Sequence, residues 1–476
     1  MTEVLTSPSR SLPRPGSRSL SLGVARLILG RSFASALDGM ERAQWMSRSE
    51  IDERTSARLA ELLEHASTTV PFYRSHLRLD ARPTKNTART DLASFPVVTK
   101  HDLRSAGLDE FVSDALPAHR RLGRTTSGSS GDPFRIFLDR AALPVVFASH
   151  IFYDQWCGLA VGERYIRLVA PTADYDDADG AGPHAYRFRQ RLARRLRERY
   201  ERRTQRRTWV GDVDPEAAER FRAEIEAFEP AYLLGYTSTL AAVSAELLRR
   251  DRPLNRRPRG VITIAELLTP ERRHLIEHYF RAPIWNRYGL REFGWWAGQN
   301  CSSSPDSLHL NTELLVCEVL TSDDSPARAG ELGRVVLTDL HNRAMPLIRY
   351  DTGDLAVAET GSCACGRTFP LITIVGRAHE SFRSASRRFV TPGHLGAALS
   401  ESGAADSQYQ LVQEAPDRVR LVVVPGDVLA DATRAQLQRA VESVVGGDVQ
   451  VSVETADRIS PERSGKRPTI KPSAIA

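Results

Sequence analysis

Short apolar runs typical of β-strands alternate with helical segments through the middle of the chain. The strand-like runs are RYIRLVAP, AYLLGY, GVITIAE and APIWNRYG, and they lie between residues 164 and 289. Two of the intervals contain the helical segments TLAAVSAELLRRD and ERRHLIEHYF. Because strands that are joined through helices pair in parallel, this alternation predicts an α/β fold with parallel or mixed sheets.

A second, smaller unit is expected after Gly376. A chain of 476 residues exceeds what one hydrophobic core organises, so two or more domains are expected. Beyond Gly376 the runs YQLVQEA, DRVRLVVVPG and VQVSVET surround the helical segment DATRAQLQRAVESVV, which is an α+β pattern. We therefore expect a large domain of mixed sheets flanked by helices over residues 31–375 and a small α+β domain over residues 376–476.

Composition places the chain among ordinary globular proteins, with 41% hydrophobic and 26% charged residues. No run approaches the roughly 18 to 20 apolar residues of a membrane span. The first 30 residues are rich in Ser, Pro and Arg and lack the apolar stretch of a signal peptide, so a disordered tail on a cytoplasmic protein without a membrane partner is expected. Five cysteines in so long a chain do not form a disulfide framework.

Basic residues are distributed unusually. Lys and Arg together number 65, but only four of them are lysines, so a lysine inside a motif stands out. Residues 187–207 contain eleven arginines and two glutamates. We expect this stretch to be solvated helix surface; nucleic-acid binding, which belongs to a different class of function, is the alternative.

Residues 125–134, TTSGSSGDPF, combine hydroxyl side chains with glycine. A linker or a hairpin turn would have this composition, and the alternating run FRIFLD that follows predicts a strand at residues 134–139. The other interpretation is a phosphate-binding loop, in which backbone N–H groups and hydroxyls surround an anion. The loop lacks the final Gly-Lys-Ser/Thr of a Walker loop, so its sequence alone does not decide between them.

Four further segments follow this loop in a fixed order: NRYGLREFG (286–294), RYDTGDL (349–355), GRAHESF (376–382) and SGKRP (464–468). Together the five resemble the motifs of the adenylate-forming superfamily of acyl-CoA ligases and adenylation domains. VPFYRSHL, FPVVTKHDLR and HNRAMPLIRYDTGDL are similar to its phenylacetate-CoA ligase-like branch. The resemblance extends over about residues 60 to 470 and depends on the order of the motifs.

The resemblance implies an enzyme with a large N-terminal domain and a small mobile C-terminal domain. Such an enzyme uses ATP to convert a carboxylic acid, here expected to be aromatic, into an acyl-AMP with release of pyrophosphate. The acyl group is then expected to pass to CoA; an amine, a carrier protein or another nucleophile is the alternative acceptor. The partners are the small-molecule acid and the acceptor, and a homodimer is compatible with the sequence.

The resemblance also implies roles for individual residues in nucleotide binding. Tyr288, next to Gly289, would stack on adenine, Glu292 would coordinate Mg²⁺, and Asp354 would accept hydrogen bonds from the ribose hydroxyls. The hydroxyl-rich loop would hold the β and γ phosphates through Thr126, Ser127, Gly128, Ser129, Ser130 and Gly131.

The remaining assignments concern the hinge, the catalytic lysine and the acyl pocket. Arg377 would support the ribose or the phosphates, and Lys466 would contact the α-phosphate and the carboxylate when the small domain closes. The acyl and adenine side would be lined by Ala265, Glu266, Tyr236 and Ser238. With Glu292, Asp354 and Lys466 present, a catalytically inactive relative is disfavoured.

Two positions depart from the pattern of the superfamily. Many loops of the superfamily end in Pro-Lys, whereas this one reads Asp132-Pro133-Phe134, so a lysine is missing there. The hinge position, often Asp or Lys, corresponds to His379, followed by Glu380. The second departure keeps the alternative acceptors open.

Three cysteines and one histidine suggest a metal site. Cys363 and Cys365 form a C-x-C pair, and Cys301 precedes His309 by eight positions. Three thiolates and one imidazole make a closed tetrahedral set, and relatives in the branch look similar at these positions, so structural Zn²⁺ is expected. Buried free thiols are the alternative, and Cys157 and Cys317 are expected to be ordinary buried residues.

Overall fold

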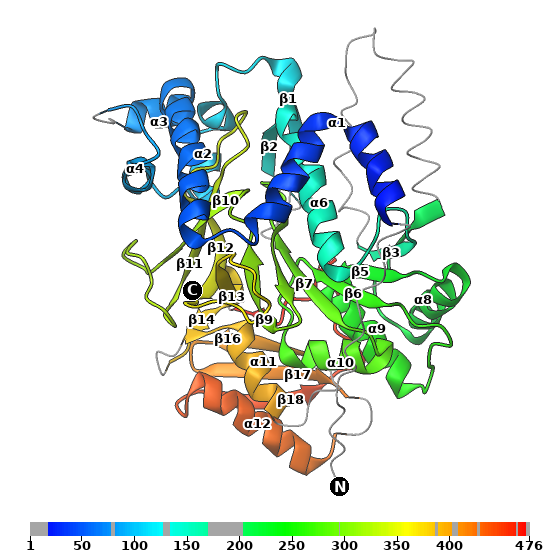
Figure 1. Cartoon of the computed structure of the whole chain (residues 1–476). Helices are drawn as coiled ribbons and strands as arrows, with labels where there is room; N and C mark the ends of the chain where they lie inside the picture. The colour runs from blue at the N-terminus through cyan, green and yellow to red at the C-terminus, as the bar shows by residue number, and fades with distance from the viewer. Residues whose placement is uncertain are drawn as a thin grey trace.

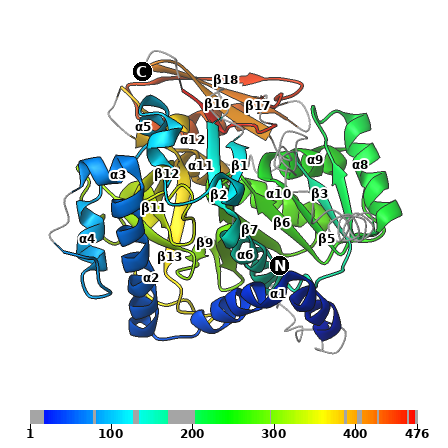
Figure 2. The same ribbon diagram turned by 90° about the horizontal axis from the view of Figure 1, so that it is seen from above.

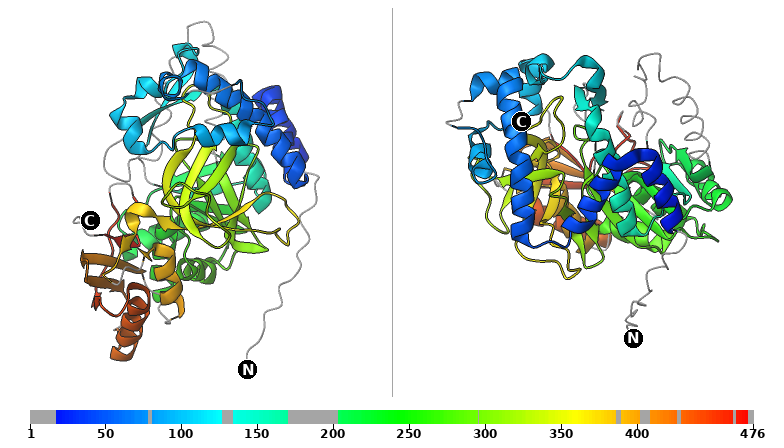
Figure 3. Two further views of the ribbon diagram at one scale, coloured as in Figure 1. Left: turned by 90° about the vertical axis from the view of Figure 1, so that its left-hand side faces the viewer. Right: turned by 45° about the horizontal axis from the view of Figure 1, so that its top comes forward.

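The structure is a computed structural model, and it describes residues 18–77, 81–126, 134–169, 203–294, 296–385, 389–401, 408–425, 429–462 and 465–472. A large sheet forms the centre of the molecule. The N-terminal helices lie on one side of it and a smaller sheet with two helices lies on the opposite side (Figures 1 and 3).

The large sheet has eleven strands in the order β10-β11-β12-β13-β9-β8-β7-β6-β5-β3-β4. One half of it, from β4 to β7, is parallel, and the predicted α/β fold is confirmed. All five residues of β5 and of β6 are buried, as expected for strands that are covered on both faces. The parallel strands and the helices that follow them are β3 (Tyr165–Leu168), β4 (Gln205–Thr208), α8 (Pro215–Phe228), β5 (Tyr232–Tyr236), α9 (Thr237–Arg249), β6 (Gly260–Ile264), α10 (Pro270–Phe280) and β7 (Ile284–Gly289).

The other half of the sheet is antiparallel, and the change of direction occurs at β7, which runs parallel to β6 and antiparallel to β8. Seen from above, the two halves lie on opposite sides of the molecule, the parallel one with α8 and α9 and the antiparallel one with the N-terminal helices (Figure 2). Its strands are β8 (Trp296–Cys301), β9 (Ser304–Leu310), β10 (Leu315–Leu320), β11 (Leu332–Asp339), β12 (Tyr350–Ala358) and β13 (Leu371–Arg377).

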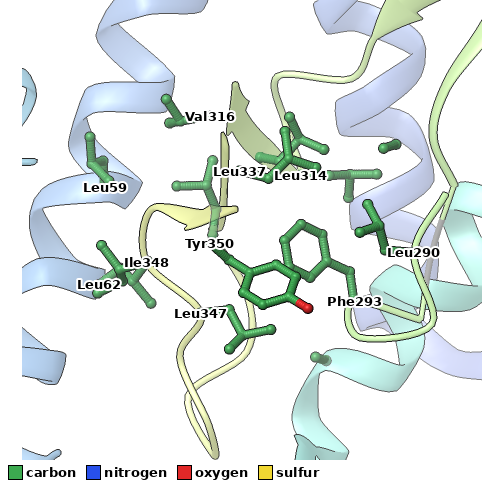
Figure 4. Close-up of a cluster of buried hydrophobic side chains, with 14 of the residues drawn as sticks. Leu59, Leu62, Leu290, Phe293, Leu314, Val316, Leu337, Leu347, Ile348 and Tyr350 are labelled. Carbon is green, nitrogen blue, oxygen red and sulfur yellow. The ribbon is translucent and has the colours of Figure 1, made fainter. Parts of the chain in front are cut away.

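The largest hydrophobic core lies between the antiparallel half and the N-terminal helices. Leu59 and Leu62 of α2 face Leu337 of β11 and Leu314, and Tyr350 lies beside Phe293 (Figure 4). The helices of this region are α1 (Arg18–Ala43), α2 (Arg48–Thr69), α3 (Pro71–His76), α4 (Ala88–Ser94), α5 (Lys100–Ser105) and α6 (Leu143–Cys157), with short 3-10 helices at Leu108–Phe111, Ala118–Arg120 and Arg140–Ala142.

Two expectations for basic segments need correction. Residues 18–30 were expected in a disordered tail, but they form the first half of α1; residues 1–17 lie outside the described ranges. The arginine-rich stretch was expected to be helical. Its residues up to 202 also lie outside the description, and residues 205–207 belong to the edge strand β4, because they pair with β3.

The hydroxyl-rich segment connects two paired strands. β1 (Arg121–Thr126) and β2 (Phe134–Asp139) are antiparallel, and Thr126 is opposite Phe134. The strand predicted at residues 134–139 is therefore confirmed. Residues 127–133, with the candidates Ser127, Gly128, Ser129, Ser130 and Gly131, lie outside the described residues.

The C-terminal unit has a core of its own, which contains Leu411, Leu421, Leu437 and Val441. The expected boundary at Gly376 falls in β13, the last strand of the large sheet along the chain. The elements of the unit are a 3-10 helix (Ala378–Glu380), β14 (Phe382–Arg383), β15 (Phe389–Val390), α11 (Pro392–Glu401), β16 (Gln408–Ala415), β17 (Arg418–Val424), α12 (Asp431–Val445), β18 (Gln450–Thr455) and β19 (Ile470–Lys471).

Gly376 occupies a backbone position that favours glycine. Its φ is +144°, and a Cβ at this residue would lie 2.6 Å from the ring of Pro392, which begins α11.

The helices of the described residues include none that is both long enough and apolar enough to cross a membrane.

Candidate active site

The carboxyl ends of β6 and β7 open onto a cavity of about 340 Å³. Open α/β sheets bind ligands outside the carboxyl ends of their parallel strands, and β6 and β7 are two such strands. The C-terminal unit closes the cavity from the other side. Nine residues that the sequence motifs singled out line this cavity: Ala265, Glu266, Tyr288, Gly289, Asp354, Arg377, His379, Glu380 and Lys466.

Asp354 lies at the centre of a hydrogen-bonded group. It is nearly buried, at 4% exposure, and accepts the Tyr288 hydroxyl at 2.7 Å on Oδ2 and Arg377 Nε at 3.0 Å on Oδ1. The register of β12 and β13 places Asp354 directly opposite Arg377. The charge of Asp354 raises the pKa of Arg377, so the guanidinium stays protonated. Three residues from distant motifs are thus joined by side-chain contacts.

Lys466 approaches this group from the C-terminal unit. Burial and the charge of Arg377 lower its pKa from 10.5 to about 8, while the carboxylates of Glu266, Glu380 and Asp354 act in the opposite direction. The lysine is therefore mostly charged at neutral pH, and it loses its proton as the pH rises through about 8.

Glu266 connects the two domains beside Lys466. Its Oε1 accepts the backbone N–H of Arg467 at 3.0 Å, and its Oε2 accepts the N–H of Ser238 in the first turn of α9 at 2.9 Å. The Arg467 side chain, which is 4% exposed, donates to Ile459 O at 2.9 Å and to Thr239 Oγ1 at 3.2 Å. This arrangement fixes the backbone next to the lysine against the large domain.

Glu292 lies in the turn after β7, outside the group of residues that line the cavity in the described structure. Its Oε1 accepts the hydroxyl of Tyr350 at 3.3 Å. Tyr350 begins β12 and is held in the core beside Phe293 (Figure 4). The charge of Glu292 raises the pKa of Arg377, so Glu292 belongs to the same electrostatic environment as the cavity residues.

Of the other candidates, Ala265 lines the cavity, whereas Tyr236, Ser238 and Thr126 are not among the described residues that line it. Ala265 follows β6 with a φ of +69°, a conformation that is uncommon for residues other than glycine and that occurs at functional sites. Tyr236, at the end of β5, is packed into an apolar cluster with Trp209. Ser238 lies at the start of α9, and Thr126 ends β1.

A buried charged group under the cavity was missed by the sequence analysis. Arg287 of β7 is almost inaccessible, with 1% side-chain exposure, and pairs with Asp154 of α6 at 2.8 Å. Its Nε also donates to Gln299 at 2.5 Å, and its Nη2 contacts Cys157 Sγ at 3.3 Å. In a chain so rich in arginine, the sequence offers no signal that distinguishes this one.

The four candidate zinc ligands come together. Their ligand atoms all lie within 4.8 Å of one another. Cys301 Sγ and Cys363 Sγ are 3.5 Å apart, and Cys365 Sγ is 3.5 Å from His309 Nε2. A disulfide requires about 2.05 Å between its sulfurs, whereas ligands of a tetrahedral zinc lie about 3.5 to 3.8 Å apart. The donor set and its spacing therefore fit zinc.

An arginine holds the loop that carries Cys363 and Cys365. The guanidinium of Arg367 lies over the rings of Trp156, at 4.1 Å, and Trp45, at 5.2 Å. Its Nε donates to Gln44 at 2.9 Å. The loop is thus anchored to α6 and to the junction of α1 and α2, away from the cavity.

Comparisons with known proteins agree with this architecture. No profile of a known protein family matches the sequence. The chain is 19% identical over 427 residues to Protein CapK of Staphylococcus aureus, which covers 88% of both chains. It is 26% identical over 350 residues to a phenylacetate-coenzyme A ligase of Pseudomonas putida, which covers 71% of this chain and 72% of the relative.

Among solved structures, the fold is similar to that of 2-hydroxyisobutyryl-CoA ligase. The TM-score is 0.71 for its post-adenylation state in complex with R3-HIB-AMP, at 20% identity and covering 91% of this chain and 92% of that one. For the thioesterification state of the same ligase, in complex with 2-HIB-AMP and CoA, the TM-score is 0.57. The TM-score is therefore higher for the post-adenylation structure of that ligase than for its thioesterification structure.

In its fold and in its curated relatives, the chain is similar to adenylate-forming enzymes of the acid-CoA ligase type. Within that superfamily, the curated relatives support the phenylacetate-CoA ligase-like branch, as the sequence motifs predicted.

Proposed function

We propose that this protein uses ATP to activate an aromatic carboxylic acid as its acyl-AMP, releases pyrophosphate and transfers the acyl group to CoA. The observation that carries the proposal is the meeting of Tyr288, Asp354, Arg377 and Lys466 around one cavity. These residues come from four separate motifs, and each has a chemical use in this reaction.

Asp354 and Tyr288 suit the nucleoside. Each oxygen of Asp354 already accepts one hydrogen bond and keeps a further lone pair, so the carboxylate can also accept ribose hydroxyls. Tyr288 presents an aromatic ring in the cavity, and its own hydroxyl is bonded to Asp354, which fixes the ring for stacking on adenine.

Lys466 and Arg377 suit the reacting phosphate. During adenylation the acid carboxylate attacks the α-phosphorus, and negative charge increases on the oxygens around it. Two positioned cations stabilise that charge more than water does, because the site holds them there before the reaction. Glu266 supports this role by holding the adjacent Arg467 backbone.

The phosphates that leave need neutralisation as well. We assign this task to the hydroxyl-rich loop that starts at Thr126 and to Mg²⁺ held by Glu292. A partly buried carboxylate with the Tyr350 hydroxyl as its partner suits a hard cation, which would offset the phosphate charge when bound.

The acid and the acceptor have separate support. Tyr236 ends the strand next to β6 and belongs to an apolar cluster with Trp209, Tyr232 and Trp285, which favours an apolar or aromatic acid. CoA is favoured over an amine or a carrier protein because 2-hydroxyisobutyryl-CoA ligase, whose structures give TM-scores of 0.71 and 0.70, is named for CoA.

We also propose that Cys301, His309, Cys363 and Cys365 hold one structural zinc ion. All four positions of a tetrahedral ion would be filled by the protein, which leaves none for a substrate. The ion would fasten the loop before β13 to β8 and β9, and so support the strand that ends at Arg377.

The proposal is tested by measuring pyrophosphate release from ATP with a panel of aryl and aliphatic acids, each with and without CoA. Acid-dependent release that CoA accelerates, together with an acyl-CoA product, is expected. Acid-dependent release that is indifferent to CoA would retain adenylation and reject CoA as the acceptor. No release with any acid would contradict the assignment.

A further inference from the structure

A buried carboxylate lies at the contact between the two domains. Glu271, in the first turn of α10 of the large domain, is 1% exposed. Its Oε1 accepts the hydroxyl of Tyr409, which belongs to β16 of the small domain and is 7% exposed. The hydroxyl of Thr269, the N-cap residue of α10, donates to the same oxygen. None of the sequence motifs contains this carboxylate, and none of the roles assigned above uses it.

A glycine allows the two domains to approach each other beside this carboxylate. Gly396 lies in α11 of the small domain. A Cβ at this residue would lie 2.8 Å from the Cβ of Thr269 and 3.0 Å from Oε2 of Glu271. A larger residue would therefore hold α11 away from the start of α10, and the glycine lets Tyr409 reach the carboxylate.

The hydrogen bonds of Glu271 satisfy only one of its two oxygens. Among the described residues, Oε2 of Glu271 has no hydrogen-bond partner, and neither has Oγ of Ser238. Both residues line a small cavity of about 30 Å³ between the domains, together with Tyr409. Burying a carboxylate costs free energy that its hydrogen bonds must offset. The closed contact is thus opposed by the desolvation of Glu271 and stabilised by the Tyr409 hydroxyl, so its equilibrium depends on that hydroxyl.

The strand that carries Tyr409 also supports the segment that carries Lys466. β16 pairs with β19, and the side chain of Gln410 donates to the carbonyl of Pro468 at 2.8 Å. Lys466 precedes this carbonyl by two residues and lines the active-site cavity. Holding β16 against Glu271 therefore also holds the lysine segment against the large domain.

We propose that Glu271 is a positioning residue, whose hydrogen bond from Tyr409 holds the small domain in the arrangement that places Lys466 in the cavity. The contact is separate from the bond between Glu266 and the Arg467 backbone, because it fastens β16. Its importance for catalysis rests on the function proposed above, since Lys466 acts there on the α-phosphate. The position of Lys466 can be measured without that activity.

The rarity of lysine provides the measurement. Lysyl endopeptidase cleaves after lysine, and the chain has only four. Cleavage after Lys466 releases residues 467–476, which mass spectrometry identifies. When opening is fast, such cleavage reports how often the lysine segment leaves the interface. Lys85, with a side chain that is 53% exposed, is the internal reference, and Lys100, at the start of α5 in the large domain, reports general unfolding.

Three variants of the full-length protein change the contact in different ways. Tyr409→Phe removes the donor and keeps the ring, and Glu271→Ala removes the acceptor. Gly396→Ala separates the two helices, although alanine favours α11 itself. Tyr279→Phe is the matched control, because its hydroxyl donates to the carbonyl of Arg252 at 2.9 Å within the large domain.

We expect cleavage after Lys466, relative to cleavage after Lys85, to rise by about tenfold in the three variants, as for loss of a hydrogen bond to a charged group. The control should stay within about twofold of the unaltered protein, and Lys100 should remain protected in all of them. An unchanged ratio in Tyr409→Phe, or an equal rise after Lys100, would overturn the proposal. The expected pattern in a protein that forms no acyl-AMP with any acid would support the contact and contradict the proposed function.

Discussion

Glu266 and Arg467 join the two domains directly, because the backbone N–H of Arg467 donates to the Glu266 carboxylate at 3.0 Å. The residue before Arg467 is Lys466, so this bond positions the lysine over the cavity. A side chain of the large domain thus determines where a residue of the small domain stands.

Replacing Glu266 should therefore impair adenylation without unfolding the protein. Glu266→Ala removes the acceptor for the N–H groups of Arg467 and Ser238, and we expect the rate of acid-dependent pyrophosphate release to fall by about tenfold or more. Glu277→Ala, on an exposed part of α10, is the matched control. Equal rates for the two variants would show that the bond does not position Lys466.

Lys466→Ala should have a larger effect on the chemical step. Removing one positioned charge from the transition state lowers the rate by roughly 10² to 10³-fold, and we expect a loss of this size in acyl-AMP formation. The dissociation constant for ATP should change by less than about threefold. Lys85→Ala, measured in parallel, should behave as the unaltered protein; near-normal activity of Lys466→Ala would remove this lysine from the mechanism.

The pH dependence of adenylation should report on the same side chain. Because the pKa of Lys466 is lowered to about 8, the ammonium is present below that pH and is lost as the pH rises through it. We expect kcat for acyl-AMP formation to fall above about pH 8. Lys466→Arg, which stays charged, should abolish this fall even if its overall rate is lower. A rate that stays level to pH 10 in the unaltered protein would contradict the assignment.

Zinc should copurify with the protein at about one ion per chain. Cys363→Ser removes one of four ligands and should lower both the zinc content and the melting temperature, because the ion links the loop before β13 to β8 and β9. Cys317→Ser, a thiol outside this cluster, is the control. A folded, metal-free preparation with the unaltered melting temperature would refute the zinc proposal.

The regular elements were predictable from the sequence because their patterns are local. Neighbouring residues specify the apolar runs that form β5, β6 and β7. They also specify the start of α5, where Thr99 and Asp102 form a capping box. The isolated parallel bridge between Val98 and Tyr350 was not predictable. The two residues are far apart in the sequence, and neither belongs to a distinctive pattern.

The same distinction applies to the site. The ordered motifs led to Tyr288, Asp354, Arg377 and Lys466, which line one cavity. Their mutual contacts, such as the hydrogen bond from Tyr288 to Asp354, depend on strand register and became visible only in three dimensions. Arg287 was missed because an arginine buried against Asp154 looks like any other arginine in the sequence.

The central claim is that the chain makes an acyl-AMP, and its most direct test is to identify that product. The full-length protein is incubated with ATP, Mg²⁺ and each of a panel of carboxylic acids, without CoA, and the nucleotides are analysed by mass spectrometry. We predict an acyl-AMP and an equal amount of pyrophosphate with at least one acid, and neither with Lys466→Ala. Conversion of ATP to ADP, or no conversion with any acid, would contradict the account.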